Sequence, residues 1–357
     1  MSCKNVTMTA VPWSSTSYIF TQEDVDTWDI SNLKSFDNLF NDFKGTVIDI
    51  SKLTFNQNIT SMNSMFKGCS EVTEIIGLEN INTSNVTNTI NTFYNCASLK
   101  SLNISSWNMG KVTNMSSMFN GCSSITNIDL SNWNVSKATD MSSMFRNCSS
   151  MTHLDLSRWV VDNVQNMPDM FNGCSKLNSL TLNWDLSHVL VLRGMFQGAG
   201  LSKIEGITFS EEPPYNNDVN QRRNISNFAR ACPNLTSIDI DLRGFCRHDE
   251  MFRESPNISY IKSIDFTYDI IPNTNFAWAT NLTKLTDLNL TGTISVSIPH
   301  GFNNMPNLTI KCLTDIINAL VDLSGSDSKI CYLGATNLAK LSSDVIAIAT
   351  NKNWTLQ

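Results

Sequence analysis

The chain has 357 residues, of which 41% are hydrophobic and 9% aromatic, which is enough for a real core and argues against wholesale disorder. Only 16% of the residues are charged, and the net charge of −7 disfavours a general nucleic-acid or anionic-membrane binder. No run of about twenty apolar residues occurs, so the sequence predicts no membrane-spanning helix.

Residues 1–27 carry no clear repeat, and we expect them to cover the first coil of the array that follows or to attach it to something else. The first eight residues lack the basic-then-apolar pattern of a secretory signal. This predicts either a chain that does not use that export route or one whose signal was removed.

Residues 28–310 are expected to form a repeat array. Five of the ten cysteines are spaced by 26 or 27 residues, whereas disulfide scaffolds place cysteines irregularly. Because a fixed spacing is the mark of a repeat, the cysteine serves as the anchor of each copy. Eleven copies follow, anchored at Phe43, Cys69, Cys96, Cys122, Cys148, Cys174, Ala199, Cys232, Ser255, Leu282 and Met305.

Each copy has two halves with different periods. Apolar residues at i, i+3, i+4 and i+7 predict a short helix, and alternating apolar residues such as Ile128 and Leu130 predict a short half-buried strand. In the same copy the helical set is Met115, Met118, Phe119 and Cys122. Neither half can bury its apolar side alone. The predicted fold is therefore an α/β repeat: a leucine-rich-repeat solenoid of about eleven coils, each a short helix and a short parallel strand, with N- and C-terminal caps.

Two recurring residue types are interpreted mainly as core. The regular cysteines lie in the predicted helices, which pack about 8–10 Å apart, beyond the range of a disulfide, so we expect a ladder of buried thiols. Tryptophans recur in phase with the core, which favours packing between coils over an exposed row that stacks on sugar rings or a partner. They are Trp28, Trp107, Trp133, Trp159 and Trp184.

The later part of the chain departs from the regular repeat. A polar insertion at residues 210–224 is either a binding loop or a tolerated surface loop. Residues 311–357 are expected to form a C-terminal helical cap. Within it an apolar period predicts a helix over 313–323, and Ser342 precedes a second short helix as a capping residue.

The stretch from Asn114 to Trp133 resembles the BspA-type leucine-rich-repeat family, whose repeats carry a Met-Phe-x-x-Cys helix and a Leu-Asp-Leu-Ser strand at this spacing. The resemblance is specific over about residues 54–210 and fades towards 310. The closing residues, 333–342 and 349–356, look like an end found on such arrays in gut bacteria and their bacteriophages. The resemblance implies a surface adhesin or a phage virion or tail protein, and it brings no catalytic residues.

Bacterial members of that family usually have an export signal and often an anchoring segment, and neither is recognised in this sequence. That departure favours a phage virion or tail-associated protein, of receptor-binding or fibre type, over a bacterial cell-surface adhesin. A structural decoration protein of a particle is the third alternative. The expected location is the virion, or else the bacterial surface. The expected partners are host surface polysaccharide or protein, other virion proteins or copies of the chain itself, with no nucleic acid and no membrane.

No motif predicts catalysis. The four histidines are scattered, and neither a Cys-x-x-Cys pair nor a nucleotide-binding loop occurs, so we expect no enzyme, no cofactor and no metal. The candidate binding surface is the outward strand face, where short polar side chains recur coil by coil; a merely solvated face is the alternative, and its aspartates make a poor calcium cage. The candidates are Asn103, Asn127, Asp129, His153, Asp155, Ser179 and Thr181.

Overall fold

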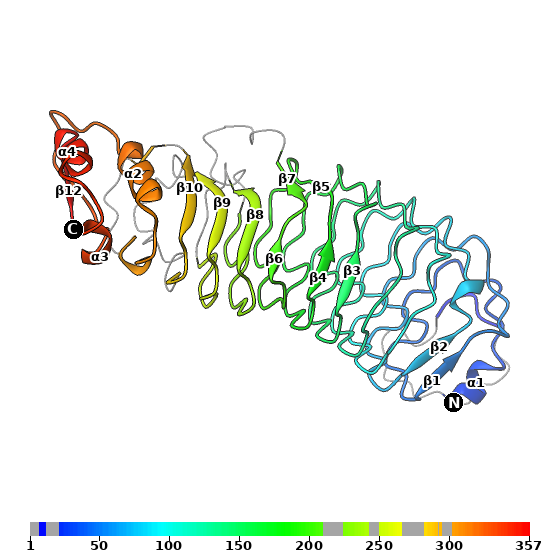
Figure 1. Ribbon diagram of the computed structural model, residues 1–357. Coiled ribbons are helices and arrows are strands. Elements are labelled where there is room, and N and C mark those ends of the chain that lie inside the picture. Colours follow the sequence, from blue (N-terminus) through cyan, green and yellow to red (C-terminus); the bar gives the residue numbers. More distant parts are fainter. Residues whose placement is uncertain are drawn as a thin grey trace. The chain divides into compact units, whose positions relative to one another are not determined.

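The computed structural model describes residues 7–11, 21–209, 224–242, 250–265, 282–291, 293–294 and 302–357 (Figure 1). These residues belong to two compact units, Met1–Val189 (unit 1) and Leu190–Gln357 (unit 2). Most of the predicted insertion, 210–223, lies outside the described residues, as do Cys246, His248 and His300.

Unit 1 is a stack of coils joined by parallel pairing (Figure 1). β1 pairs with β2 and β3 with β4, and isolated parallel bridges link the intervening coils. The elements are α1 (Gln22–Val25), β1 (Val47–Asp49), β2 (Glu74–Ile76), η1 (Leu78–Asn80), β3 (His153–Asp155), β4 (Ser179–Thr181) and β5 (Trp184–Asp185). The predicted solenoid with parallel strands is confirmed, although residues 101–104 and 127–130 are not assigned as strand.

Unit 2 continues the repeat around a four-stranded parallel sheet in the order β10-β9-β8-β6. Its strands are β6 (Lys203–Ile204), β7 (Ile207–Thr208), β8 (Ser237–Leu242), β9 (Tyr260–Asp265), β10 (Asp287–Thr291), β11 (Lys329–Cys331) and β12 (Trp354–Leu356). Its helices are η4 (Phe302–Asn304), α2 (Ile310–Ala319), α3 (Ala335–Leu338) and α4 (Ser343–Asn351). In both units the anchor residue of every copy is buried, as the repeat predicts.

In the described coils before the Leu282 copy, the half that was expected to be a helix is instead a ribbon of turns. In the Cys122 copy, Ser117 and Gly121 have φ values of 55° and 80°, which a right-handed helix does not allow. The N–H groups of Met115, Ser117, Phe119 and Gly121 donate to carbonyls of the next coil at 2.8–2.9 Å. Short local bonds, such as Met118 N–H to the Met115 carbonyl at 3.2 Å, close the turns between them. The helix prediction was wrong because these turns present apolar side chains inward at nearly helical spacing.

The core of unit 1 is a row of stacked rings. Adjacent phenylalanine rings have centroids 5.2–5.7 Å apart and planes within 11° of parallel. The row consists of Phe40, Phe66, Phe93, Phe119, Phe145 and Phe171. Each tryptophan from Trp107 to Trp184 is also buried, and its indole N–H donates to a carbonyl of the preceding coil at 3.0–3.2 Å. The core interpretation of the tryptophans is therefore confirmed.

The predicted ladder of buried thiols is confirmed, but the packing distance expected between the coils was wrong. Cys69, Cys96, Cys122, Cys148 and Cys174 are buried and free. The coils around them are hydrogen-bonded to one another, not held apart at helix-packing distance. Each thiol donates to the carbonyl of a phenylalanine in the preceding coil, as Cys122 Sγ does to Phe93 at 3.1 Å. Burial raises the pKa of Cys174 to about 12.

Asn, Asp, Ser and Thr are abundant because the corners of the coils use them. The side-chain oxygen of Asn134 accepts a bond from Ser136 N–H at 3.0 Å, and Asp140 accepts from Ser142 N–H at 2.8 Å, which are Asx turns. Elsewhere a hydroxyl bonds the preceding coil, as Thr139 Oγ1 does to the Thr113 carbonyl at 3.1 Å. The low charge noted in the sequence therefore has a structural cause.

The two ends carry different closing elements. At the N-terminal end the Gln22 side chain pairs with both main-chain groups of Asp49, at 2.7 and 2.9 Å, and so covers part of the open edge of β1. In unit 2, α2 begins at Ile310, three residues before the predicted start, while α4 follows its predicted cap at Ser342. Lys352 Nζ donates to the carbonyls of Asn318 and Leu320 at 2.8 and 2.7 Å, which satisfies the end of α2.

Candidate recognition surface

The seven candidate residues lie on the outward side of the coils of unit 1, and all are exposed. His153 is in parallel register with Ser179, and Asp155 with Thr181, while Leu154 between them points into the core. Register partners in adjacent parallel strands lie about 4.8 Å apart. Asn103, Asn127 and Asp129 occupy the equivalent positions in the two preceding coils, which have no assigned strand there. The structure therefore arranges the seven in two neighbouring columns, which we call the polar shelf.

The two aspartates of the polar shelf have a structural role that the sequence analysis did not predict: each accepts hydrogen bonds that close a turn. Asp129 Oδ1 accepts bonds from Ser131 N–H at 3.0 Å and from the Ser131 hydroxyl at 2.7 Å. Asp155 Oδ1 accepts from Ser157 N–H at 3.0 Å. These bonds to serine hold the pKa of both carboxyls below the usual value. The recurrent Asp-x-Ser pattern is the signal of such a turn, and each carboxylate keeps Oδ2 outside it.

Two other members of the polar shelf already have neighbours. Asn103 Nδ2 lies 3.4 Å from Glu79 Oε2 in the preceding coil, and His153 Nδ1 lies 3.3 Å from the Thr152 hydroxyl. Both contacts are on the exposed surface, where water competes with them. The polar shelf therefore offers hydroxyl, amide, imidazole and carboxylate groups at fixed positions, suited to binding a polar surface.

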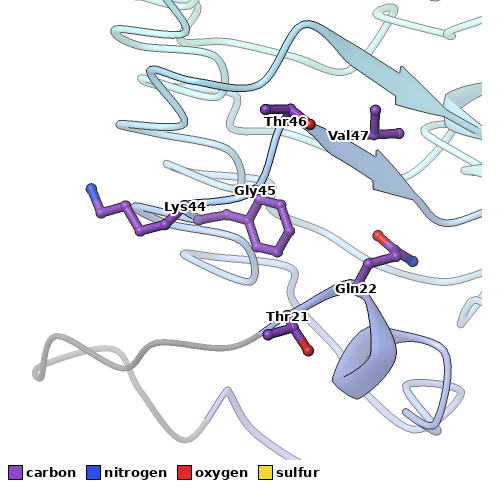
Figure 2. Close-up of a pocket in the computed structure, with 7 residues that line it drawn as sticks. Thr21, Gln22, Lys44, Gly45, Thr46 and Val47 are labelled. Carbon is purple, nitrogen blue, oxygen red and sulfur yellow. The ribbon is translucent and has the colours of Figure 1, made fainter.

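A separate pocket lies at the N-terminal end of unit 1, between α1 and β1 (Figure 2). Its volume is about 420 Å³, and it is lined by Thr21, Gln22, Phe43, Lys44, Gly45, Thr46 and Val47. The Lys44 side chain extends away from the other lining residues, and the Gln22 amide is engaged with Asp49 (Figure 2). Its lining therefore provides neither an acid–base pair nor an activated nucleophile.

The described residues show neither a metal-binding cluster nor a membrane span. No group of three or more of their histidine, cysteine, aspartate or glutamate side chains gathers as metal ligands do. No helix in the described ranges combines the length and apolar character needed to cross a membrane.

Comparison with known proteins identifies one family model. The model described as "Mycoplasma protein of unknown function, DUF285" matches residues 10–102, 60–153 and 90–209, more than half of the chain in total. The coarse prediction of a repeat protein is confirmed, whereas the phage-like closing residues lie outside the matched range. No curated protein matches the sequence.

Solved structures of repeat proteins are similar at low identity. A leucine-rich repeat protein from Bacteroides ovatus is 15% identical, with a TM-score of 0.43 over 82% of this chain and 68% of that one. An internalin from Listeria monocytogenes is 14% identical, with a TM-score of 0.29 over 93% and 91%. A leucine-rich cell surface protein from Faecalibacterium prausnitzii is 15% identical, with a TM-score of 0.27 over 84% and 82%.

Proposed function

Because the chain belongs to the DUF285 family, whose description names no activity, we propose its function from its own surface: non-enzymatic recognition of another surface through the polar shelf of unit 1. The observation that carries the proposal is the register of exposed polar groups, with His153 beside Ser179 and Asp155 beside Thr181 on a hydrogen-bonded stack. Groups held in place before binding lose little conformational freedom when a partner arrives.

The proposed partner is a polysaccharide or protein on a host cell surface, because both present repeated polar groups that hydroxyl, amide and carboxylate side chains can bond. The proposal includes no catalytic residue and no cofactor. Copies of the chain itself, or other proteins of the same particle, are the alternative partners.

The finer proposal concerns where the protein is carried. Residues 333–342 and 349–356 resemble an end found on such arrays in gut bacteria and their bacteriophages, and we propose a virion or tail-associated protein, with a bacterial cell-surface adhesin as the alternative. Mass spectrometry of purified phage particles and of washed cell envelopes from the source culture separates the two. Recovery in envelopes alone contradicts the virion proposal.

The test of recognition is saturable binding of the labelled full chain to intact candidate host cells. The variant combines Asn127→Ala and His153→Ala with Asp129→Asn and Asp155→Asn, since asparagine keeps the oxygen that accepts the turn bond. The control variant changes exposed residues in other parts of the same coils: Lys137→Ala, Asp162→Ala and Gln165→Ala. We expect the first variant to lose binding and the control to keep it.

The first variant is called the shelf variant. If circular dichroism shows that both variants are folded and the shelf variant still binds unchanged, the polar shelf is not the site. Absence of binding by the unaltered chain at tens of micromolar argues for a structural decoration protein instead.

A further inference from the structure

The outward face of the four-stranded sheet in unit 2 differs in chemistry from the polar shelf. Ile204, Ile238, Ile261 and Leu288 are buried and in register across the four strands, so the residues that alternate with them point outward. Four outward residues, one from each strand, form a row in direct register: Lys203, Ser237, Tyr260 and Asp287. A second, less regular row lies two residues further along, where the direct register is lost: Glu205, Asp239, Lys262 and Asn289.

Tyr260 is the aromatic member of these rows, and its residue surface is 40% exposed. It stands between Ser237 of β8 and Asp287 of β10, both in direct register with it. Within the described part of the chain no second ring or cation is recorded against its ring. A tyrosine that is exposed on a rigid sheet offers a flat apolar face and a hydroxyl at little cost in conformational entropy.

Both pairings of β9 change register just beyond Tyr260. The shift falls between Ile238 and Asp241 on the β8 side and between Leu288 and Leu290 on the β10 side. Such bulges increase the local twist of a sheet and re-aim side chains, and they are common beside functional sites. The sheet is therefore locally distorted on both sides of the exposed ring.

The charges around Tyr260 are largely compensated within the face. Lys203 Nζ lies 2.6 Å from Glu205 and 3.3 Å from Asp239, and Lys262 Nζ lies 3.5 Å from Asp239. These side chains are still 37–55% exposed, so their remaining donors and acceptors can reach a ligand. Two lysines and, with Asp287, three acidic residues leave this face a net charge of −1, so it attracts a polyion only weakly and suits an uncharged ligand with many hydroxyls.

We propose that this face of β6, β8, β9 and β10 binds a neutral oligosaccharide, with one sugar ring stacked on Tyr260 and neighbouring hydroxyls bonded by Asp239, Lys262 and Asp287. The face is three inter-strand distances wide and extends two residues along the strands. Its footprint is therefore about 14 by 7 Å, which accommodates a few sugar rings. The site deepens the proposed recognition role by naming a ligand class, but it is built from residues other than the polar shelf.

The test is titration of the full chain with neutral gluco-, manno- and galacto-hexaoses, followed by saturation-transfer NMR and calorimetry. We expect at least one hexaose to bind. Tyr260→Ala should weaken that binding by about three- to tenfold, whereas Tyr260→Phe, which keeps the stacking face, should stay within about twofold. Raising the salt from about 50 to 500 mM should change the affinity less than about twofold, because no net charge is neutralised.

Three outcomes overturn the proposal. They are no binding of any hexaose up to about 10 mM, equal affinity of Tyr260→Ala and the unaltered chain, or binding of heparin alone with a steep loss in salt. Unchanged thermal unfolding of both variants excludes a folding defect. The shelf variant of unit 1 should keep hexaose binding, so loss of host-cell binding in that variant and loss of hexaose binding in Tyr260→Ala report on two separate proposals.

Discussion

The ribbon of turns in each regular coil leads to a specific prediction about Gly121. This residue has φ of 80°, a conformation that costs a residue with a Cβ about 1 kcal/mol. A Cβ at this position would also lie inside van der Waals contact of Asn95 Oδ1 and 3.3 Å from Asn95 Cα in the preceding coil. Because the Asn95 side chain is exposed and its amide can turn aside, we take the lower end of the cost of overpacking, about 1 kcal/mol. We therefore expect Gly121→Ala to lower the free energy of unfolding by about 2 kcal/mol.

A second substitution separates the two contributions. Asn95→Gly removes the amide that fills the space, and residue 95 itself has φ of 57°, which glycine accepts. The double variant Asn95→Gly, Gly121→Ala should recover about 1 kcal/mol of the loss, leaving mainly the backbone cost. Gly325→Ala is the matched control, because Gly325 has φ of 85° and no atom lies within 4 Å of the place that an alanine Cβ would take, so only the backbone cost of about 1 kcal/mol applies.

The assay is urea unfolding of the full chain followed by tryptophan fluorescence, with hydrogen exchange of the Cys96 and Cys122 coils to locate the effect. Exchange is needed because coils of a repeat array can open separately. A loss for Gly121→Ala no larger than that for Gly325→Ala, or no recovery in the double variant, would refute the steric argument.

Three further predictions concern the core and the caps. Trp133→Phe should cost about 1 kcal/mol beyond the lost contacts, because the Ile104 carbonyl loses the indole N–H that it accepts at 3.1 Å and keeps only the Trp107 N–H. Thermal unfolding measures this cost, and a neutral result contradicts the role of the indole bond. The free energy of unfolding should be constant from pH 7 to 8 and fall as the pH rises above about 9. The cause is that thiols of the unfolded chain lose their protons there, while burial raises the pKa of Cys174 to about 12 in the folded chain. Urea unfolding measured at several alkaline pH values checks the sign, and a free energy that does not change with pH refutes it. Lys352→Met should speed hydrogen exchange at the end of α2 and leave unit 1 unchanged, and equal protection in both proteins refutes the capping role.

The regular part of the fold could be predicted from the sequence because burial repeats with it. A spacing of 26 residues places the counterparts of Phe119 and Cys122 at the same depth in the regular coils of unit 1, and both residues are buried as expected. The turn ribbon could not be predicted from that spacing, since the turns and a helix bury the same positions. A signal was nevertheless present: the position before the anchor alternates between glycine and an acidic or amide residue, all with φ above zero. The residues are Asp42, Gly68, Asn95, Gly121, Asn147 and Gly173.

The sequence was enough to predict that the candidate residues are exposed, but not which of them also hold turns of the main chain. Alternation with Leu154 placed His153 and Asp155 outward, and the structure agrees. The turn role of Asp155 was missed because a carboxylate that recurs for a ligand and one that recurs for a turn look alike until the serine two residues later is considered. Tyr260 was missed for another reason: the spacing of anchors drifts beyond residue 200, so its outward phase could not be read from the earlier copies.

In the regular coils, different residues stabilise the stack and face outward, which explains why the outward face is available for binding. The phenylalanine stack, the thiols and the corner turns fix each coil through bonds to its neighbours, and none of those bonds uses the outward side chains of His153, Ser179 or Tyr260. One outward column accordingly reads Asn127, His153 and Ser179 in successive coils, while the inward positions repeat almost unchanged. Substitutions in this column therefore alter what the surface offers at little cost to the stack, and a recognition protein needs that freedom.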